Sequence, residues 1–572
     1  MEVHMAEITK KDIIQLLEEI AVYLELNLEN NFRVSAYRKA ANALETDQRS
    51  LSEMDSFEGI KGIGKGTITL INEYIKTGKS SLLEELKNGT PAGLVQMTKI
   101  PGLGAKRVAK IYEATNIVTI DELKAFCEDN ELQKLPGFGK KTEENILNGI
   151  NELLTKPDRY PIDQILKFRK LIEDKISALD FVLKYDVAGS ARRTKETSGD
   201  LDYIIKTSDV SAFISKMKES SFFKSVIAEG EKKFSIVIKD DFKEINTDFR
   251  FIQGDEYYST LQHFTGSKDH NIRMRQIAKT RGESISEYGV KQEDDSVITF
   301  ESEEAFYNHF DLPFIPPAMR ETGEEIDMDI SNIVTLDDIK GDIHMHTTYS
   351  DGAMNIEEMV EACINRGYEY MVITDHSKSL VVANGLDENR LYKQIEEIKK
   401  INDKYPEIDV YAGTEMDIRP DGTLDFSDDT LQALDYVIAA IHSSFNQSVA
   451  EIMERLKNAC YNPYVRHIAH PTGRLIGARI GYRVNMDELI QMAKDTNTVL
   501  EVNANPKRLD LSSDVIKHKD LLLTVNTDAH HTRHLEFMKY GIATLQKGLI
   551  SKDQVVNAMS REEFKQFIKN GK

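Results

Sequence analysis

Histidine and carboxylate residues recur at short spacings in the last two-fifths of the chain, where ten of the fourteen histidines lie after Gly341. His344 and His346 follow a short apolar run, so both imidazoles face one side if that run is a strand. Seven further ligand types lie near the ends of other apolar runs: Asp351, His376, Glu415, His442, His470, Asp528 and His530. Mixed nitrogen and oxygen ligands suit Mn²⁺, Zn²⁺ or Fe²⁺. Such ions activate water for phosphoester hydrolysis, which is the chemistry that this part of the sequence predicts.

Three aspartates form a second candidate site that contains neither histidine nor cysteine. Asp200 and Asp202 are two residues apart in an apolar run, so a strand would place both carboxylates on one face. Asp248 is a third carboxylate in the run 245–252, and Arg250 shares its face. Oxygen ligands alone favour Mg²⁺. A pair of such ions supports attack of a 3′-hydroxyl on a triphosphate, so this pattern predicts nucleotidyl transfer.

A glycine motif occurs three times in the N-terminal part of the chain, at 59–65, 100–106 and 135–141. Each copy has the frame apolar-x-Gly-apolar-Gly, is followed by basic residues and leads into a helical pattern. A side-chain-free loop at a helix N-terminus offers backbone N–H groups to phosphate without reading bases. The three copies resemble helix-hairpin-helix motifs and predict contacts to the DNA backbone through Gly62, Gly64, Lys65, Gly102, Gly104, Lys106, Gly137, Gly139 and Lys140.

Composition limits how the chain can meet nucleic acid. Its net charge is −22, so DNA contacts must come from local basic clusters on an acidic body. The three cysteines lie far apart without metal-type spacing and are expected to be buried and reduced, as in a cytoplasmic protein. No apolar stretch is long enough to span a bilayer, and no signal peptide is expected.

Local patterns assign the motifs to different kinds of structure. An amphipathic helix is expected over 9–27, with Thr9 and Asp12 opening it as a capping box. A Pro- and acid-rich stretch, 312–325, predicts a linker. Strands are expected at 181–187, 203–206, 234–238 and 248–252. Beyond Asp338, apolar runs alternate with helical patterns and predict a βα-barrel, with strands at 371–373, 410–412, 437–440, 499–502 and 521–525.

The aspartate segment resembles the catalytic palm of the family X DNA polymerases, of the polymerase-beta type. The resemblance rests on the Gly-Ser-x-x-Arg and Ser-Gly-Asp-x-Asp segments and on His263-Phe264-Thr265-Gly266-Ser267. It implies that Ser190 and Arg193 contact the incoming triphosphate, that Asn271 contacts the base edge and that Arg275 lies against the template. Phe264 and Gly266 would flank the sugar. The full nucleotide-binding set is Gly189, Ser190, Arg193, Ser198, Gly199, Phe264, Gly266, Asn271 and Arg275.

Two positions depart from the family pattern. Many relatives carry Tyr-Phe where this chain has His263-Phe264. The resemblance therefore does not predict how well this chain excludes ribonucleotides. In relatives with deoxyribose-phosphate lyase activity, a Schiff-base lysine lies eight residues after the first glycine of the first hairpin. That position is Leu70, which has no amine and cannot form an imine. The N-terminal domain is therefore expected to bind a gapped end without cutting it by that chemistry.

The C-terminal ligand set resembles the PHP (polymerase and histidinol phosphatase) domain, a distorted barrel with up to three metal ions. Following that pattern, one ion would bind His344, His346, Glu415 and Asp528. A second would bind Asp351, His376 and His530, and a third Glu415, His442 and His470. Arg474, Arg479, Arg483 and Lys507 are candidates for phosphate contacts, although solvated surface is about as good an interpretation for each.

The resemblance covers essentially the whole chain and implies a multidomain protein. Its parts are α-helical N-terminal helix-hairpin-helix domains, an α+β nucleotidyltransferase palm and thumb, and a C-terminal distorted (β/α)7 PHP barrel. The expected domains are a helical DNA-end-binding domain (1–90), a fingers-like helix-hairpin-helix domain (91–155), the palm (156–260), a thumb-like nucleotide-binding domain (261–315), a linker (316–338) and the PHP domain (339–572).

The expected function is DNA polymerisation that fills short gaps in repair, with 3′–5′ exonuclease activity and a capacity to cut abasic sites as a further expectation. Mg²⁺ is expected in the polymerase site, and Mn²⁺, Zn²⁺ or Fe²⁺ in the PHP site. The partners would be gapped or primer–template DNA and deoxynucleoside triphosphates, without a membrane, and a monomer is expected.

Two alternatives stay open at this point. The C-terminal domain could instead hydrolyse a small phosphate ester or pyrophosphate. The whole chain could be a non-catalytic scaffold that binds DNA ends, but such a protein has no need to retain the three carboxylates Asp200, Asp202 and Asp248.

Overall fold

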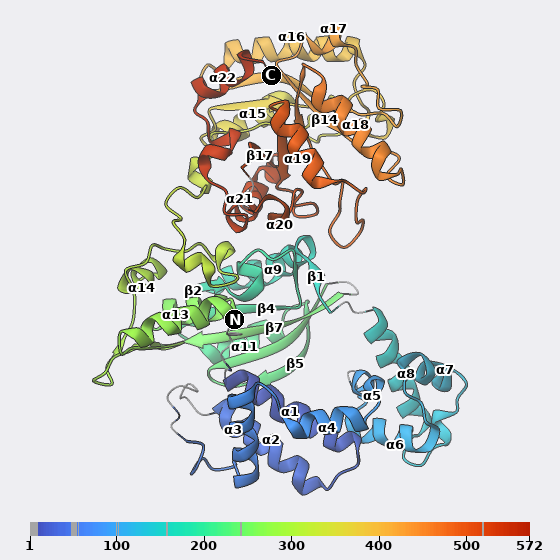
Figure 1. The fold of residues 1–572 in the computed structure, drawn as a ribbon, viewed down its shortest axis with the longest axis vertical. Helices are drawn as coiled ribbons and strands as arrows, with labels where there is room; N and C mark the ends of the chain where they lie inside the picture. The colour runs from blue at the N-terminus through green and yellow to red at the C-terminus, as the bar shows by residue number, and fades with distance from the viewer. Residues whose placement is uncertain are drawn as a thin grey trace. The chain divides into compact units, whose positions relative to one another are not determined.

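The structure is a computed structural model that describes residues 8, 10–46, 54, 56–98, 100, 102–155, 158–240, 243–517 and 520–571. The chain divides into two compact units, 1–158 and 159–572, which are described separately (Figure 1). In the described residues, no helix is long and apolar enough to cross a membrane. All three cysteines are buried, as the sequence predicted.

The first unit is helical and contains two apolar cores. Ile13, Leu17 and Ile20 of the first helix are fully buried, which confirms the predicted amphipathic face, whereas Thr9 of the predicted capping box lies outside the described residues. The first core lies among α1, α2 and α3, and the second among α5 to α8. The helices are α1 (Lys10–Leu26), α2 (Asn31–Thr46), α3 (Lys65–Thr77), α4 (Ser81–Gly89), α5 (Ala92–Met97), α6 (Ala105–Thr115), α7 (Ile120–Glu128) and α8 (Lys140–Thr155).

A five-stranded mixed sheet begins the second unit, and its strand order is β2-β4-β7-β6-β5. The strands are β2 (Val182–Val187), β4 (Asp200–Thr207), β5 (Phe223–Glu229), β6 (Lys233–Asp240) and β7 (Lys243–Ile252). Helices α9 (Ile162–Ser177) and α11 (Val210–Lys218) pack on one face, and α12 (Tyr257–Thr265) packs on the other. The four predicted strands are confirmed. The sequence patterns missed β5, an edge strand that is mostly exposed and whose apolar residues are separated by Lys224 and Ser225.

The segment predicted as a linker, 316–338, packs into the neighbouring apolar core. Met319 and Ile326 are buried against Met274 of α13 (Lys268–Thr280) and Phe306 of α14 (Glu303–His309). Arg320 is fully buried, and its Nη1 donates to Glu303 Oε1 at 2.6 Å. Proline and acidic residues favour a linker by composition, but tertiary packing here covers the apolar residues between them.

Seven parallel strands then form a barrel whose order follows the sequence. They are β11 (Gly341–Asp342), β12 (Tyr370–Ile373), β13 (Asp409–Asp417), β14 (Tyr436–Ala440), β15 (Val465–Ile468), β16 (Val499–Asn503) and β17 (Leu523–Asn526). A parallel bridge between Met345 and Ala529 joins the chain after β11 to the chain after β17. The predicted barrel is confirmed, and β15 was missed because Arg466 and His467 interrupt its apolar run.

Candidate active sites

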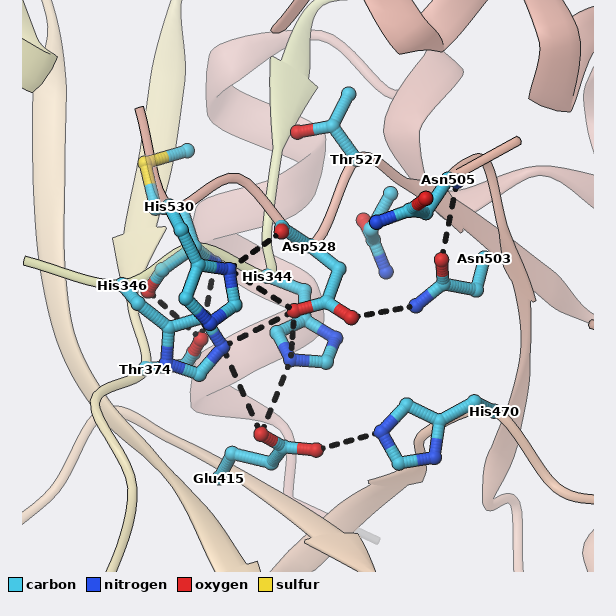
Figure 2. Close-up of polar contacts among 12 residues, drawn as sticks. His344, His346, Thr374, Glu415, His470, Asn503, Asn505, Thr527, Asp528 and His530 are labelled. Carbon is cyan, nitrogen blue, oxygen red and sulfur yellow. Dashed lines mark hydrogen bonds and ion pairs between the residues drawn. The ribbon is translucent and has the colours of Figure 1, made fainter. Parts of the chain in front are cut away.

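The predicted ligands of the C-terminal part gather at the carboxyl ends of the barrel strands. The parallel strands present those ends at one mouth of the barrel, where loops after different strands meet. Figure 2 shows Glu415 and Asp528 facing imidazoles that come from several of these loops. We call the set of nine the histidine cluster: His344, His346, Asp351, His376, Glu415, His442, His470, Asp528 and His530.

Glu415, on β13, lies at the centre of the histidine cluster and is almost fully buried. Its Oε2 is 2.8 Å from His376 Nδ1, and its Oε1 is 2.8 Å from His470 Nε2. Oε1 is also 3.1 Å from His442 Nε2. Oε2 lies at a longer distance from two more imidazoles, 3.5 Å from His344 Nε2 and 3.6 Å from His346 Nε2. One carboxylate therefore faces five imidazoles.

A second carboxylate, Asp528, approaches the same ring nitrogens of His344 and His346 as Glu415 does. Its Oδ1 is 3.2 Å from His346 Nε2 and 3.6 Å from His344 Nε2. Asp351 Oδ1 lies 3.3 Å from His530 Nε2 and 3.7 Å from His376 Nε2. These distances leave room for cations between the groups, because metal–ligand bonds of about 2 Å separate two ligands of one ion by roughly 3 Å.

The grouping differs in detail from the predicted one. Groups whose ligand atoms lie within 4.8 Å of one another are His344, His346 and Asp528; His346, Asp351, His376 and His530; and His376, Glu415 and His442. His346 and His376 each belong to two groups, whereas the sequence assigned each to one ion. His470 lies outside these groups and reaches the cluster through its contact to Glu415.

Divalent cations fit the donor atoms of this cluster. Within the part of the chain that the structure describes, His344 Nε2, both ring nitrogens of His346 and Glu415 Oε2 are buried without a hydrogen-bond partner. Buried polar atoms of this kind are costly unless something satisfies them. Imidazole nitrogens and carboxylate oxygens together are the ligands of first-row divalent ions.

The pKa values in the cluster shift in opposite directions. Burial alone would lower the pKa of His344, but the carboxylates of Glu501 and Glu415 hold it well above its ordinary value. The pKa of Glu415 lies well below its ordinary range despite burial, because imidazoles surround it. Burial, followed by the charge of His530, lowers the pKa of His346 to about 3. The ionised carboxylates stabilise positive charge in this site, on His344 or on a cation, whereas His346 stays neutral.

Sequence reasoning missed the residues that hold the ligands in place. Glu501 on β16 is fully buried, and its Oε1 lies 2.8 Å from His344 Nδ1, the ring nitrogen that faces away from Glu415. Its Oε2 accepts a hydrogen bond from the backbone N–H of His470 at 2.8 Å. Asp417 Oδ1 lies 3.2 Å from His442 Nδ1 in the same way. The sequence did contain a signal for Glu501, because it is the one charged residue in the otherwise apolar run 499–502.

The three aspartates meet on the five-stranded sheet and form what we call the aspartate site. Strands β4 and β7 are parallel, and their register places Asp202 beside Asp248. Burial, followed by the charges of Asp200 and Asp248, raises the pKa of Asp202 to about 6. Lys233 Nζ lies 2.7 Å from Asp248 Oδ2 and compensates part of this charge. Carboxylates this close together favour a divalent cation between them.

Gly189 lies directly against the aspartate site. It has a φ of +59°, and a Cβ atom there would lie 2.6 Å from Asp202 Oδ2. A glycine is therefore required both by its backbone conformation and by the close approach. Ser190 Oγ lies 2.7 Å from Ser198 Oγ, so the Gly-Ser segment and the Ser198-Gly199 segment adjoin each other beside the carboxylates.

The predicted nucleotide segment of α12 and α13 contacts the same region. Arg193 Nη1 donates to the carbonyl oxygen of Thr265 at 2.5 Å, next to Gly266. Arg250 lies over the ring of Phe264, with its Cζ 3.7 Å from the ring centroid. Asn271 Nδ2 donates to the carbonyl oxygen of His263 at 2.7 Å. The structure thus brings the two halves of the predicted nucleotide site together.

His263, the departure from Tyr-Phe, is a neutral side chain. Burial lowers its pKa to about 4, and the positive charges of Arg275 and Arg250 act in the same direction. Its ring packs edge-on against Phe264, with ring centroids 4.9 Å apart. The ring therefore lies beside the residue predicted to flank the sugar.

The three glycine motifs of the first unit adopt the same turn. The N–H groups of Ile63, Leu103 and Phe138 donate to the carbonyl oxygens three residues earlier, at 2.9–3.1 Å. These central apolar residues are buried, whereas the paired glycines and Lys65, Lys106 and Lys140 are exposed. Gly62, Gly102 and Gly137 all have positive φ. Each motif therefore presents backbone and ammonium groups to solvent ahead of a helix.

Leu70 is 6% exposed and belongs to the core of α1, α2 and α3. Its side chain packs where the family pattern would place an amine. Lys65 and Lys76, the nearest lysines in the sequence, are exposed.

Among the candidate phosphate contacts, Arg474 is engaged within the barrel domain. Its Nε donates to the carbonyl oxygen of Arg508 at 2.9 Å, and its Nη2 donates to the carbonyl oxygen of Leu509. Arg483 and Lys507 are exposed, and Arg479 is half-buried. The structure favours a structural function for Arg474.

Family models match successive parts of the chain. A helix-hairpin-helix domain matches residues 8–80, and a SAM-like helix-hairpin-helix tandem matches 54–114 and 94–152. The DNA polymerase beta palm matches 159–274, and the corresponding thumb matches 260–321. The PHP domain matches 342–505.

Curated relatives cover the chain to different extents. The DNA polymerase/3′-5′ exonuclease PolX of Bacillus subtilis (strain 168) is 50% identical over 566 residues, 98% of this chain and 99% of that protein. DNA polymerase lambda of Rattus norvegicus is 23% identical over 51% of this chain and 53% of its own length. A probable phosphatase of Caldicellulosiruptor bescii is 32% identical over 28% of this chain and 63% of that protein.

Proposed function

Because this chain belongs to the family X DNA polymerases that carry a C-terminal PHP domain, we propose that it fills short gaps at the aspartate site and trims 3′ ends at the histidine cluster. It is a DNA-directed DNA polymerase with a metal-dependent 3′–5′ exonuclease activity. Its substrates are DNA and nucleotides. We propose which residues perform polymerisation and which perform 3′ hydrolysis.

Asp200, Asp202 and Asp248 are the proposed ligands of Mg²⁺ in the polymerase site. The register that places Asp202 beside Asp248 is the observation that supports this assignment. When bound, such ions activate the 3′-hydroxyl and neutralise the triphosphate. The chain aligns the three carboxylates, and Arg250 and Lys233 oppose the rise in the pKa of Asp202.

The incoming nucleotide is proposed to lie between α10 (Gly189–Arg192) and the segment 264–275. Ser190 and Arg193 would bind the triphosphate, and Asn271 would contact the base edge. Phe264 and Gly266 would flank the sugar, and Arg275 would lie against the template. The link from Arg193 to Thr265 supports a single site made from these two segments.

The nine residues of the histidine cluster are the proposed ligands of up to three ions, with Mn²⁺ as the first choice over Zn²⁺ and Fe²⁺. The carboxylate of Glu415, which faces five imidazoles, supports this assignment. When bound, the ions supply an activated water for phosphodiester hydrolysis. Glu501 and Asp417 orient His344 and His442 by accepting hydrogen bonds from their outer ring nitrogens.

The three glycine motifs are proposed to hold the DNA backbone through their exposed amides and lysines, without reading sequence. The predicted domain boundaries, a cytoplasmic location and a monomeric state complete the proposal.

One assay set tests the division of labour. Gapped DNA and a labelled single strand are each incubated with the wild-type chain, with Asp200→Ala and with the His344→Ala/His346→Ala double variant, in Mg²⁺ and in Mn²⁺. The proposal expects each variant to lose one reaction only, with hydrolysis depending more on Mn²⁺. Loss of both reactions in a folded variant would contradict separate sites. Cleavage of a phosphomonoester but not of DNA would favour the small-molecule alternative for the PHP domain.

A further inference from the structure

A pocket of about 930 Å³ lies between the loops that follow β14 and β15, and one carboxylate, Glu451, also lines it. One wall is the segment 444–447, which begins two residues after His442, and the other is the segment 478–481, which belongs to the loop after His470. Both walls therefore continue from strand ends that carry proposed metal ligands. The volume matches a site for a small ligand of nucleotide size and is too small for a duplex.

A buried arginine, Arg455, holds the first wall by hydrogen bonds. Arg455, 1% exposed, donates from Nη1 to the carbonyl oxygen of Ser443 at 3.0 Å and to Gln447 Oε1 at 2.8 Å. Phe445 on this wall stacks on Tyr482, with ring centroids 5.5 Å apart and an interplanar angle of 20°. Since Tyr482 is 5% exposed, its ring anchors the two walls to each other.

The second wall carries a cation with no carboxylate partner. Arg479 places its Cζ 4.3 Å from the centroid of the Phe445 ring, and its Nε donates to the carbonyl oxygen of Gly473 at 3.0 Å. Among the residues that the structure describes, no carboxylate lies within ion-pair distance of Arg479. A guanidinium held by a ring and a carbonyl keeps hydrogen-bond donors for an anion.

Arg508 is a second cation between this wall and the metal ligands. Its Nε lies 3.5 Å from Asp528 Oδ2, whereas the other oxygen of Asp528 faces His346. Arg508 is close enough to Arg479 for its charge to lower the pKa of that residue, after burial. Burial raises the pKa of Tyr482, and the positive charges of Arg508 and Arg479 oppose that rise. The hydroxyl of Tyr482 is buried without a hydrogen-bond partner in the described residues.

Two neighbouring guanidinium groups next to a phosphodiesterase centre are suited to two successive phosphates of one strand. Ile480, 98% exposed, lies on the same wall and offers an apolar surface to an unstacked base. Bases of single strands pack against apolar and guanidinium surfaces in this way, whereas paired bases are not available for such contacts.

We propose that this pocket binds the penultimate nucleotide of a single-stranded 3′ end, with Arg508 on the scissile phosphate and Arg479 on the next phosphate towards the 5′ end. This inference rests on the proposed function, because it takes the histidine cluster to be the site of 3′ hydrolysis. The base packs beside Ile480, which makes the pocket selective for unpaired ends.

The test uses the full chain, loaded with Mn²⁺, and compares two substrates. One is a labelled single-stranded oligonucleotide, and the other is bis(p-nitrophenyl) phosphate, which has a scissile phosphate but no second one. Arg479→Gln should raise KM for the oligonucleotide about tenfold and leave bis(p-nitrophenyl) phosphate hydrolysis unchanged. Arg508→Gln should slow both substrates. Arg366→Gln, an exposed arginine of the same domain, is the matched control and should change neither.

A modified substrate isolates the contact of Arg479. A neutral methylphosphonate at the linkage on the 5′ side of the penultimate nucleotide should slow the wild-type chain by the factor that Arg479→Gln causes. It should slow Arg479→Gln little further, because the charge pair is already absent. Ile480→Ser should weaken binding of an intact 3′ end but not of one whose penultimate nucleotide is abasic.

The outcomes distinguish a failure of the proposed pocket from a failure of the proposed nuclease function. If Arg479→Gln behaves like Arg366→Gln on the oligonucleotide, the pocket does not bind this nucleotide and the inference is wrong. If the His344→Ala/His346→Ala variant degrades the oligonucleotide as well as the wild-type chain does, the proposed function itself fails. Circular dichroism and bound Mn²⁺ should be unchanged in Arg479→Gln, so that misfolding cannot account for a loss.

Discussion

The aspartate site and the histidine cluster are both proposed to act on phosphate esters, but they differ in their side chains and in the groups that surround those side chains. The aspartate site has three carboxylates as its proposed ligands on an open sheet, and Lys233 and Arg250 moderate its charge. The histidine cluster gathers six imidazoles and three carboxylates at a barrel mouth, and six of these nine residues are buried. Further carboxylates, Glu501 and Asp417, lie against the outer ring nitrogens of His344 and His442. A site that shares its cations with a triphosphate needs few protein ligands, whereas a site that keeps its ions between turnovers needs many.

The largest expected effect is on the aspartate site. Asp202→Ala or Asp200→Ala should reduce gap filling by about 10³-fold or more, since losing a metal ligand removes several kcal/mol of transition-state stabilisation. Degradation of single-stranded DNA should continue. Primer extension on a one-nucleotide gap measures the first rate, and extension by either variant at close to the wild-type rate would show that the ligands are misassigned.

The converse change tests the other half of the comparison. His344→Ala/His346→Ala should eliminate 3′ degradation and leave nucleotide addition largely unchanged, because both imidazoles face the same pair of carboxylates, Glu415 and Asp528. Glu415→Ala should be at least as damaging. The measurement is release of labelled 3′ nucleotides, with primer extension by the same preparation as the control for folding.

A smaller effect is expected from Glu501, which lies behind His344 of the histidine cluster. Glu501→Gln should weaken Mn²⁺ binding and nuclease activity about 10- to 100-fold, the usual cost of losing a carboxylate that orients a ligating histidine. Equilibrium dialysis with Mn²⁺ measures the first and nucleotide release the second. Glu454→Gln, an exposed change on α18 (Val449–Tyr461), is the control. Equal Mn²⁺ affinity in both variants would argue against the orienting function of Glu501.

The glycine motifs should affect DNA affinity at either site without altering chemistry. Lys65→Glu with Lys106→Glu should weaken binding to every sequence alike, because these exposed ammonium groups meet phosphates rather than bases. The slope of log affinity against log salt should become shallower by about 2. Fluorescence anisotropy over a salt series provides both values, and a loss confined to particular sequences would contradict backbone binding.

The smallest expected signal concerns Leu70. Borohydride should trap no Schiff base at this position, because a buried leucine has no amine. Peptide mapping after incubation with an abasic substrate makes the measurement, and only adventitious labelling of Lys61, Lys65 or Lys76 is expected. Efficient trapping on one of these lysines would show that another amine replaces the missing one.

Much of this protein follows from short-range patterns in its sequence. Asp200 and Asp202 share a face because side chains alternate along a strand. The predicted strands 203–206 and 248–252 were confirmed as parts of β4 and β7, which pair with each other. The three glycine motifs adopt one turn because each requires positive φ at the same glycine. The barrel followed from apolar runs that alternate with helical patterns.

Tertiary structure alone decided how the ligands group and what supports them. His346 lies in two candidate ion groups because the loops after β12 and β17, which flank β11 in the barrel, converge on it, and no spacing along the chain encodes that β17 lies beside β11. Arg474, a candidate for phosphate binding, instead donates to the backbone of Arg508 and Leu509, and the Pro- and acid-rich segment 312–325 packs into a core. Residue types and local periodicity therefore determined the chemistry, whereas long-range packing selected the partner of each polar group, because burial makes an unpartnered one costly.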